Sequence, residues 1–207
     1  MRPFHHARAS AKRSGRHWRE DLEIHEFLDS SKVAYADLRH RMLLHSTDLG
    51  GELARRAFPA RADIHEVVSR HIQEDLGELR TLGDWLMRCN RTRLPRPHPR
   101  ALPIAEAELL AAEQQRQGLA DTDGPKAVLD ILRLPTILAP EFGESAWCIL
   151  GNAFGPGLVR RVLGPPVEVA GRNGTATVFD PAWCAEAIIY HLFRGIPDVR
   201  SVVTALR

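Results

Sequence analysis

The proline-rich segment at residues 94–103 constrains the fold more than any other feature of this sequence. Proline occupies four of its ten positions. Each proline lacks a backbone N–H donor and disfavours the helical conformation in the residue before it, so neither a helix nor a central strand can pass through. We therefore predict an extended linker that divides the chain into residues 1–93 and 104–207.

The first part is predicted to be a helical bundle module. Its apolar residues recur every three or four positions, and no stretch alternates convincingly with the period of two that marks a strand. A stripe that includes Leu49, Leu53 and Phe58 continues past a possible break at Gly50 and Gly51. The predicted helices cover residues 4–14, 20–28, 31–45, 63–77 and 81–89.

The second part is predicted to be mostly helical with one small β-hairpin. Two short runs of β-forming residues, 167–170 and 175–179, flank an Asn-Gly pair, which is a strong hairpin signal. The predicted helices cover residues 104–117, 125–134, 182–194 and a last segment from about 198. The sequence thus predicts a mainly α fold class, with the hairpin near 167–179.

Composition excludes several classes of protein. No apolar run approaches the roughly 20 residues that a membrane-spanning helix needs. The basic N-terminus lacks the apolar core of a secretory signal. The cysteines are odd in number and widely spaced, which argues against a disulfide framework or a zinc ribbon; they are Cys89, Cys148 and Cys184. We expect a cytoplasmic protein with reduced thiols and no membrane partner.

Basic residues gather in two stretches without acids, residues 1–19 and 85–105. Such clusters can neutralise nucleic-acid phosphates, and Arg91, Arg93 and Arg96 are the candidate contacts. Aromatic residues that would stack on bases are scarce there. A solvated tail and a solvated linker therefore explain the same pattern, and both interpretations stay open.

Histidine is concentrated in the first part of the chain, where eight of the ten histidines lie between His5 and His71. Several pair with carboxylates at helical spacing: His25 precedes Asp29 by four residues, as His71 precedes Asp75. Side chains four apart share a helical face. Helical bundles build metal sites from such faces, although a surface hydrogen bond explains any single pair.

The metal hypothesis names specific residues. A divalent transition metal (zinc, manganese or nickel) would take its ligands from the helices of this module; the candidates are His25, His45, His71, Asp29 and Asp75. Three cations near them are candidates for holding an anionic group; these are Lys32, Arg39 and Arg41. Such a site would suit a metal-dependent phosphoester hydrolase.

A metal-free hypothesis uses part of the same region. The stretch from Arg39 to His45 is similar to the Arg-x(4–6)-His motif of HEPN ribonucleases. That resemblance implies that Arg39 holds a phosphate while His45 moves protons, with two motifs meeting in a dimer. The motif is short and common in helices.

An ordered series of motifs gives a more specific resemblance over residues 5–87. It runs from His5-His6-Ala7 through Ile24-His25, Ser31-Lys32, Arg39-His40-Arg41 and His45 to His71, Glu74-Asp75-Leu76-Gly77 and Asp84-Trp85-Leu86. The series resembles a family of bacterial and phage proteins built on a conserved domain of unknown function. The resemblance implies motif positions but no activity; they are His6, His25, Asp29, Lys32, Asp37, Arg39, His40, Arg41, His45, His71 and Asp75.

Three functions therefore remain open at this stage. The leading one is a non-catalytic protein that binds a protein or nucleic-acid partner, with a polar His/Asp network in its helical module and a partner-binding C-terminal part. The others are the metal-binding module and the HEPN-like ribonuclease. Enzymatic activity, substrate and oligomeric state are left undecided by the sequence.

Overall fold

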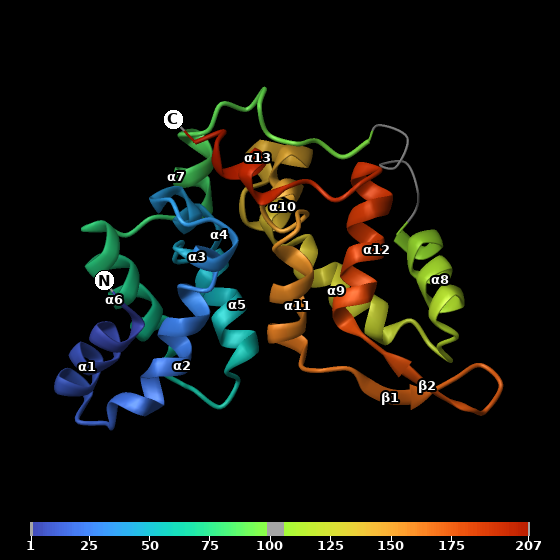
Figure 1. Ribbon diagram of the computed structural model, residues 1–207, viewed down its shortest axis with the longest axis horizontal. Coiled ribbons are helices and arrows are strands. Elements are labelled where there is room, and N and C mark those ends of the chain that lie inside the picture. The colour runs from blue at the N-terminus through green and yellow to red at the C-terminus, as the bar shows by residue number, and fades with distance from the viewer. Residues whose placement is uncertain (1, 99–105, 207) are drawn as a thin grey trace. The chain divides into compact units, whose positions relative to one another are not determined.

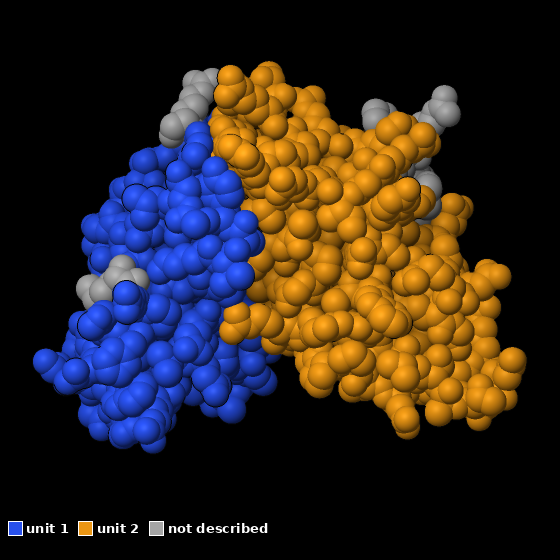
Figure 2. Space-filling view, in the orientation of Figure 1, with its two compact units in different colours: residues 1–89, 206–207 blue, residues 90–205 orange. Residues whose placement is uncertain are grey.

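A computed structural model describes residues 2–98 and 106–206 of the chain (Figure 1). These residues fall into two compact units, one of residues 1–89 with 206–207 and one of residues 90–205 (Figure 2). The described residues form helices and a single two-stranded antiparallel sheet, so the predicted mainly α class with one small hairpin is confirmed. The linker positions 99–103 and the helix positions 104–105 lie outside the described residues.

The first unit consists of short helices. The helix α2 packs against α1, α5 and α6, and α5 also packs against α6 (Figure 1). Two helices end in left-handed glycines, Gly15 and Gly77, at the positions where the sequence predicts an end. The bounds are α1 Pro3–Ser14, α2 Trp18–Leu28, α3 Ser31–Ala34, the 3-10 helix η1 Leu38–His40, α4 Arg41–Leu44, α5 Leu49–Ala57, α6 Ile64–Leu76 and α7 Leu82–Met87.

The prediction of one long helix over residues 31–45 was wrong. The backbone is extended at Tyr35 and at Asp37, so that α3 is separate from η1, which continues directly into α4. Asp37 accounts for the second start, because its side chain accepts a hydrogen bond from the backbone N–H of Arg39. The apolar spacing predicts one continuous helix, but the Asp37 cap starts a new one in the middle of it.

The possible break at Gly50-Gly51 is absent, because both residues lie inside α5. A Cβ atom at Gly50 would come within 2.0 Å of the carbonyl oxygen of Leu44. Glycine at this position therefore permits close contact between the start of α5 and the end of α4. This contact fixes the backbone on either side of His45.

The second unit has its own apolar core, in which α9, α11 and α12 pack against one another. The hairpin has the predicted place, and Val167 pairs with Phe179 while Ala170 pairs with Ala176. The segments α10, η2 and α11 are helices that the apolar spacing does not predict. The bounds are α8 Glu106–Gln117, α9 Asp123–Leu132, α10 Leu134–Leu138, the 3-10 helix η2 Pro140–Ile149, α11 Gly155–Leu163, β1 Val167–Ala170, β2 Ala176–Phe179, α12 Pro181–Phe193 and α13 Val199–Val203.

The described part of the proline-rich segment packs within the second unit. Leu94 and Pro97 are buried, and the backbone N–H of His98 donates to the carbonyl of Leu192. The division at residues 93 and 104 stays a prediction. Within the described parts of the chain, no helix combines the length and the apolar character needed to cross a bilayer.

Candidate metal centre

The core of the first unit is unusual because it contains five buried histidines. Each is at most 1% exposed, which is rare for a residue that usually keeps one nitrogen in water; they are His6, His25, His40, His45 and His71. Buried polar atoms need partners, so each ring in this core must bond to a neighbour or to a ligand.

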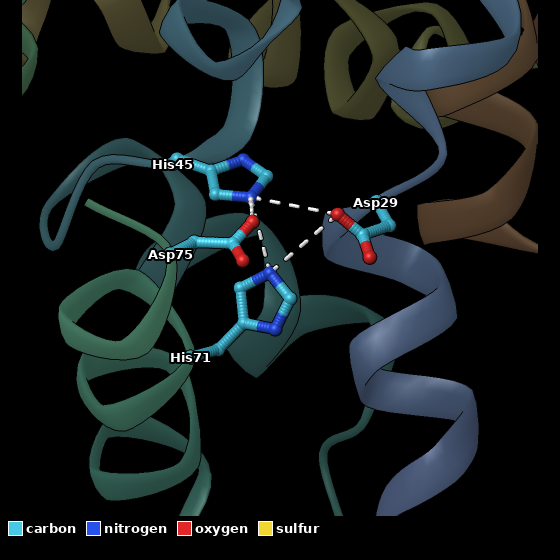
Figure 3. A group of neighbouring side chains, drawn as sticks. All are labelled: Asp29, His45, His71 and Asp75. Carbon is cyan, nitrogen blue, oxygen red and sulfur yellow. Dashed lines mark hydrogen bonds and ion pairs between the residues drawn. The ribbon is translucent and has the colours of Figure 1, made fainter. Parts of the chain in front are cut away.

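Two of these histidines meet two aspartates at one point (Figure 3). Asp29, His45, His71 and Asp75 each present one ligand atom, and all four atoms lie within 4.8 Å of one another. The four side chains come from three places in the chain. Four of the five predicted metal ligands therefore converge, and together they form a group that can hold a metal ion.

Local structure aims each of the four side chains. His71 and Asp75 are one turn apart on α6, on the same face as Ile64 and Val68, so both project inward. Asp29 caps the end of α2. His45 ends α4, and its carbonyl accepts a hydrogen bond of 2.8 Å from the indole Nε1 of Trp85.

Four of the six distances between the ligand atoms are close to those of a tetrahedral metal site. Nε2 of His71 lies 3.0 Å from Nε2 of His45, and Nε2 of His45 lies 3.3 Å from Oδ2 of Asp75. Oδ1 of Asp29 lies 3.6 Å from Nε2 of His45 and 3.7 Å from Nε2 of His71. Ligands about 2.05 Å from zinc at tetrahedral angles are separated by about 3.3 Å.

His25, the fifth predicted ligand, lies outside this group. Its Nδ1 contacts Nδ1 of His71 at 2.9 Å, and its Nε2 contacts the hydroxyl of Ser10 at 3.3 Å. A neutral imidazole has one proton, so His71 donates from only one nitrogen. When His71 donates from Nδ1 to His25, its Nε2 presents a lone pair to the centre. His25 is thus placed to orient a ligand.

His6 has a similar relation to Asp75. Its Nδ1 contacts Glu74 at 2.6 Å and its Nε2 contacts Oδ1 of Asp75 at 3.1 Å. Burial opposes the charge of this ring, but hydrogen bonds to the two carboxylates outweigh burial and raise the pKa of His6. The protonated ring fixes Oδ1 of Asp75, and Oδ2 is the oxygen that faces His45.

Burial and these contacts also shift the pKa values of His25, His71 and Asp75. Burial and the charge of His6 lower the pKa of His25 to about 4. Burial also lowers the pKa of His71 well below its usual range. Burial alone would raise the pKa of Asp75, but hydrogen bonds from His45 and His6 hold it far below the ordinary value. A neutral His71 and an ionised Asp75 are the forms in which these two side chains bind metals.

Two of the three predicted anion-holding cations reach this centre. The ammonium of Lys32 lies 2.6 Å from Oδ1 of Asp29, and the guanidinium of Arg41 lies 3.1 Å from Oδ2 of Asp75. Arg39 instead pairs with Asp37 and donates to the hydroxyl of Tyr35. Lys32 and Arg41 therefore add positive charge at the edge of the centre.

The residues of the ribonuclease hypothesis lie in different surroundings. Arg39 is in η1 with a side chain 36% exposed, whereas His45 follows α4 and is fully buried. The candidate nucleic-acid contacts belong to the second unit and are exposed there; they are Arg91, Arg93 and Arg96. The guanidinium of Arg91 lies 4.2 Å from the ring centroid of Phe142.

Comparison with protein families now adds one finding. Residues 1–94 match the model of a family described as a domain of unknown function (DUF6915). The predicted resemblance to a conserved domain of unknown function is confirmed. All four residues of the candidate centre lie within this domain. No curated protein matches the chain. No solved structure matches it either.

Four residues that support the centre were given no role in it by the metal hypothesis, although three of them belong to the motif series. His6 and Ser10 lie four apart on the predicted helix 4–14, a spacing that places both on one face. Glu74 precedes Asp75 directly, and Trp85 lies on the last predicted helix of the module. The sequence shows the spacing of His6 and Ser10. It does not show that they contact His25 and His71, because those residues are distant in sequence.

Proposed function

We propose that the N-terminal domain binds one divalent transition metal through Asp29, His45, His71 and Asp75, and that the metal stabilises its helical core. The observation that supports this proposal most is the spacing of the four ligand atoms at 3.0–3.7 Å across four measured pairs. Four protein ligands in a closed, buried set are typical of a structural metal site rather than a catalytic one.

Two further observations support the same proposal. Two carboxylates and two neutral imidazoles balance the charge of a divalent cation. Oδ2 of Asp29 is buried and has no hydrogen-bond partner among the described residues. An unpartnered carboxylate oxygen in a buried site costs free energy that a bound cation would offset. Each neutral imidazole has only one N–H donor, so His45 and His71 cannot donate hydrogen bonds to all of the carboxylate oxygens around them.

The test is metal analysis of the protein purified without chelator. We expect zinc, manganese or nickel at close to one atom per chain, and we expect loss of that metal in His71→Ala and in Asp29→Asn. His65→Ala is the matched control, because His65 lies on the same helix α6 but is exposed. The control variant should keep its metal.

Protein that is metal-free as purified and that takes up none of the three metals in equilibrium dialysis would overturn the proposal. Metal that stays bound at full stoichiometry in both ligand variants would also overturn it, because the ion would then lie elsewhere. Circular dichroism of each variant separates loss of a ligand from loss of the fold.

The other hypotheses remain predictions. The ribonuclease hypothesis gains no support from a fully buried His45 and an Arg39 that is bonded to Asp37. Binding of nucleic acid by Arg91, Arg93 and Arg96, and of a protein partner by the C-terminal part, would give the chain the non-catalytic role that its sequence favours. Cleavage of RNA that resists EDTA and is lost in Arg39→Ala would revive the ribonuclease.

A further inference from the structure

The first unit has a second polar feature, a pocket of about 220 Å³ on its surface. Four of its eight lining residues are arginines, and none of the eight is acidic; the arginines are Arg39, Arg41, Arg80 and Arg88. Trp85 and Leu38 are among the remaining residues of the lining. Guanidinium groups that gather in one pocket favour a ligand with several anionic oxygens.

The donors in this pocket are only partly used. Arg39 bonds to Asp37 and Tyr35 through Nε and Nη2. Arg80 bonds to Glu78 through Nε and Nη2 as well. The Nη1 groups of these two arginines make no hydrogen bond to the residues that the structure describes. Each guanidinium thus keeps N–H donors for a ligand.

Arg41 supplies the most specific indication. Its Nη1 donates to the carbonyl of Asp75 and its Nη2 forms an ion pair with Oδ2, but its Nε is buried and has no hydrogen-bond partner in the described part of the chain. A buried charged donor without an acceptor is costly, so an acceptor supplied by a ligand would be favourable. A charged N–H bonds best to an anionic oxygen.

Two of the lining side chains, Arg80 and Trp85, are held in place by their contacts. The guanidinium of Arg80 lies over the ring of Trp85 at 4.8 Å, and its side chain is only 13% exposed. Trp85 is itself held by its hydrogen bond to the carbonyl of His45. One carboxylate, that of Glu78, serves both Arg80 and Arg88, so these three groups have a net positive charge.

We propose that this pocket binds the phosphate group of a small phosphorylated molecule. Pockets for drug-sized ligands measure about 300–1,000 Å³, so a cavity of about 220 Å³ suits a phosphate or pyrophosphate group rather than a whole nucleotide. The pocket does not contain any of the four proposed metal ligands. The pocket adjoins the proposed metal site through the contact of Arg41 with Asp75, but binding here does not require the metal.

The experiment is isothermal titration of the full-length chain with inorganic phosphate and with pyrophosphate at low salt. EDTA-treated protein is used, so that failure of the metal proposal leaves this test intact. We expect binding of both anions, with pyrophosphate tighter. The double variant Arg39→Gln with Arg88→Gln changes exposed side chains, keeps the fold, and should weaken binding at least about tenfold. Arg80→Gln should do the same.

The matched control is Arg55→Gln with Arg70→Gln, which removes two surface arginines that each pair with a carboxylate elsewhere in the same unit. The control should bind both anions as the parent does. Equal weakening in the control would show attraction by net charge alone and overturn the proposal. Absence of binding in the parent would overturn it as well, and so would binding in EDTA that persists in both pocket variants.

Discussion

The two units of this protein differ in the polarity of the side chains that they bury. The second unit buries apolar side chains and few polar ones; the latter are Glu113, Asn152 and Asp180. The first unit buries five histidines together with Asp21 and Asp29. A polar core gains stability only when its members are satisfied, whereas an apolar core gains it from burial itself.

The buried polar residues of the two units also differ in their contacts. Asn152 bonds to the carbonyls of Cys148 and Ile149 and to the backbone of Phe154, so it stabilises a turn. His71 instead contacts two other histidines and a carboxylate, which is more polar contact than packing requires. The proposed metal would account for such a cluster.

The largest expected difference between the units is their response to a chelator. If the metal satisfies the polar core, its removal destabilises the first unit by about 4 kcal/mol when metal is present at a thousand times its dissociation constant. Hydrogen exchange measured by mass spectrometry should then show faster exchange in α2 and α6 after EDTA treatment. The helices α9, α11 and α12 should be unaffected; equal changes in both units would contradict the comparison.

A buried ion pair in each unit offers a second test of the difference between the polar and the apolar core. Asp21 is 1% exposed and accepts a hydrogen bond of 2.7 Å from Arg61. Arg61→Ala leaves this carboxylate buried and unpaired, so we expect urea unfolding to show a loss of about 3 kcal/mol.

The counterpart in the second unit is Arg160→Ala, which removes the ion pair between Arg160 and the buried Asp180. Asp180 keeps a partner there, because it also accepts a hydrogen bond from the backbone N–H of Ala182. We expect a loss of about 1 kcal/mol from this variant. A loss as large as that of Arg61→Ala would show that the two units do not differ in this respect.

The next effect concerns the orientation of a ligand. His25→Ala removes the partner of Nδ1 of His71 without removing a ligand, so metal affinity should fall by about 10–100-fold while one metal still binds. Competition with a chromophoric chelator measures this change. His191→Ala, in the second unit, should leave the affinity unaltered. Complete loss of the metal in His25→Ala would make His25 a ligand and contradict the assignment.

The smallest effect lies on the surface, where the two units should behave alike. Hydrogen bonds from Arg55, and then from Arg56, lower the pKa of Glu52 from 4.5 to about 2. Because the folded-state pKa is the lower one, this stabilisation is present above pH 4.5 and disappears as the pH falls towards 2. Glu52→Gln should cost at most about 1 kcal/mol at pH 7, since exposed ion pairs are screened.

Urea unfolding at pH 7 and at pH 3 measures the Glu52 effect, and the difference between the parent and Glu52→Gln should shrink at the lower pH. Glu106→Gln, which breaks the exposed pair with Arg133 in the second unit, should have a similarly small effect at pH 7. A cost above 2 kcal/mol in only one of the units would show that their surfaces differ as their cores do.

Much of the fold was predictable from local signals. Gly15 and Gly77 end helices, and an Asn-Gly pair turns the hairpin, because these residues accept backbone conformations that others avoid. That His71 and Asp75 share one face of α6 followed from helical spacing alone. The prediction of a helix over residues 31–45 was wrong because Asp37 caps a new helix there, although the apolar residues keep a helical spacing. The segments α10, η2 and α11 lack a clear period.

Sequence by itself determined which residue types share a helical face and where most helices end, because both depend on contacts within a few residues. It therefore named Asp29, His45, His71 and Asp75 as candidates, and also His25. Only the tertiary structure decided that the first four meet and that His25 lies behind His71. Helical periodicity fixes the direction of a side chain around its own axis. Which helices approach one another depends on packing between residues distant in sequence, such as the packing of α2 against α6.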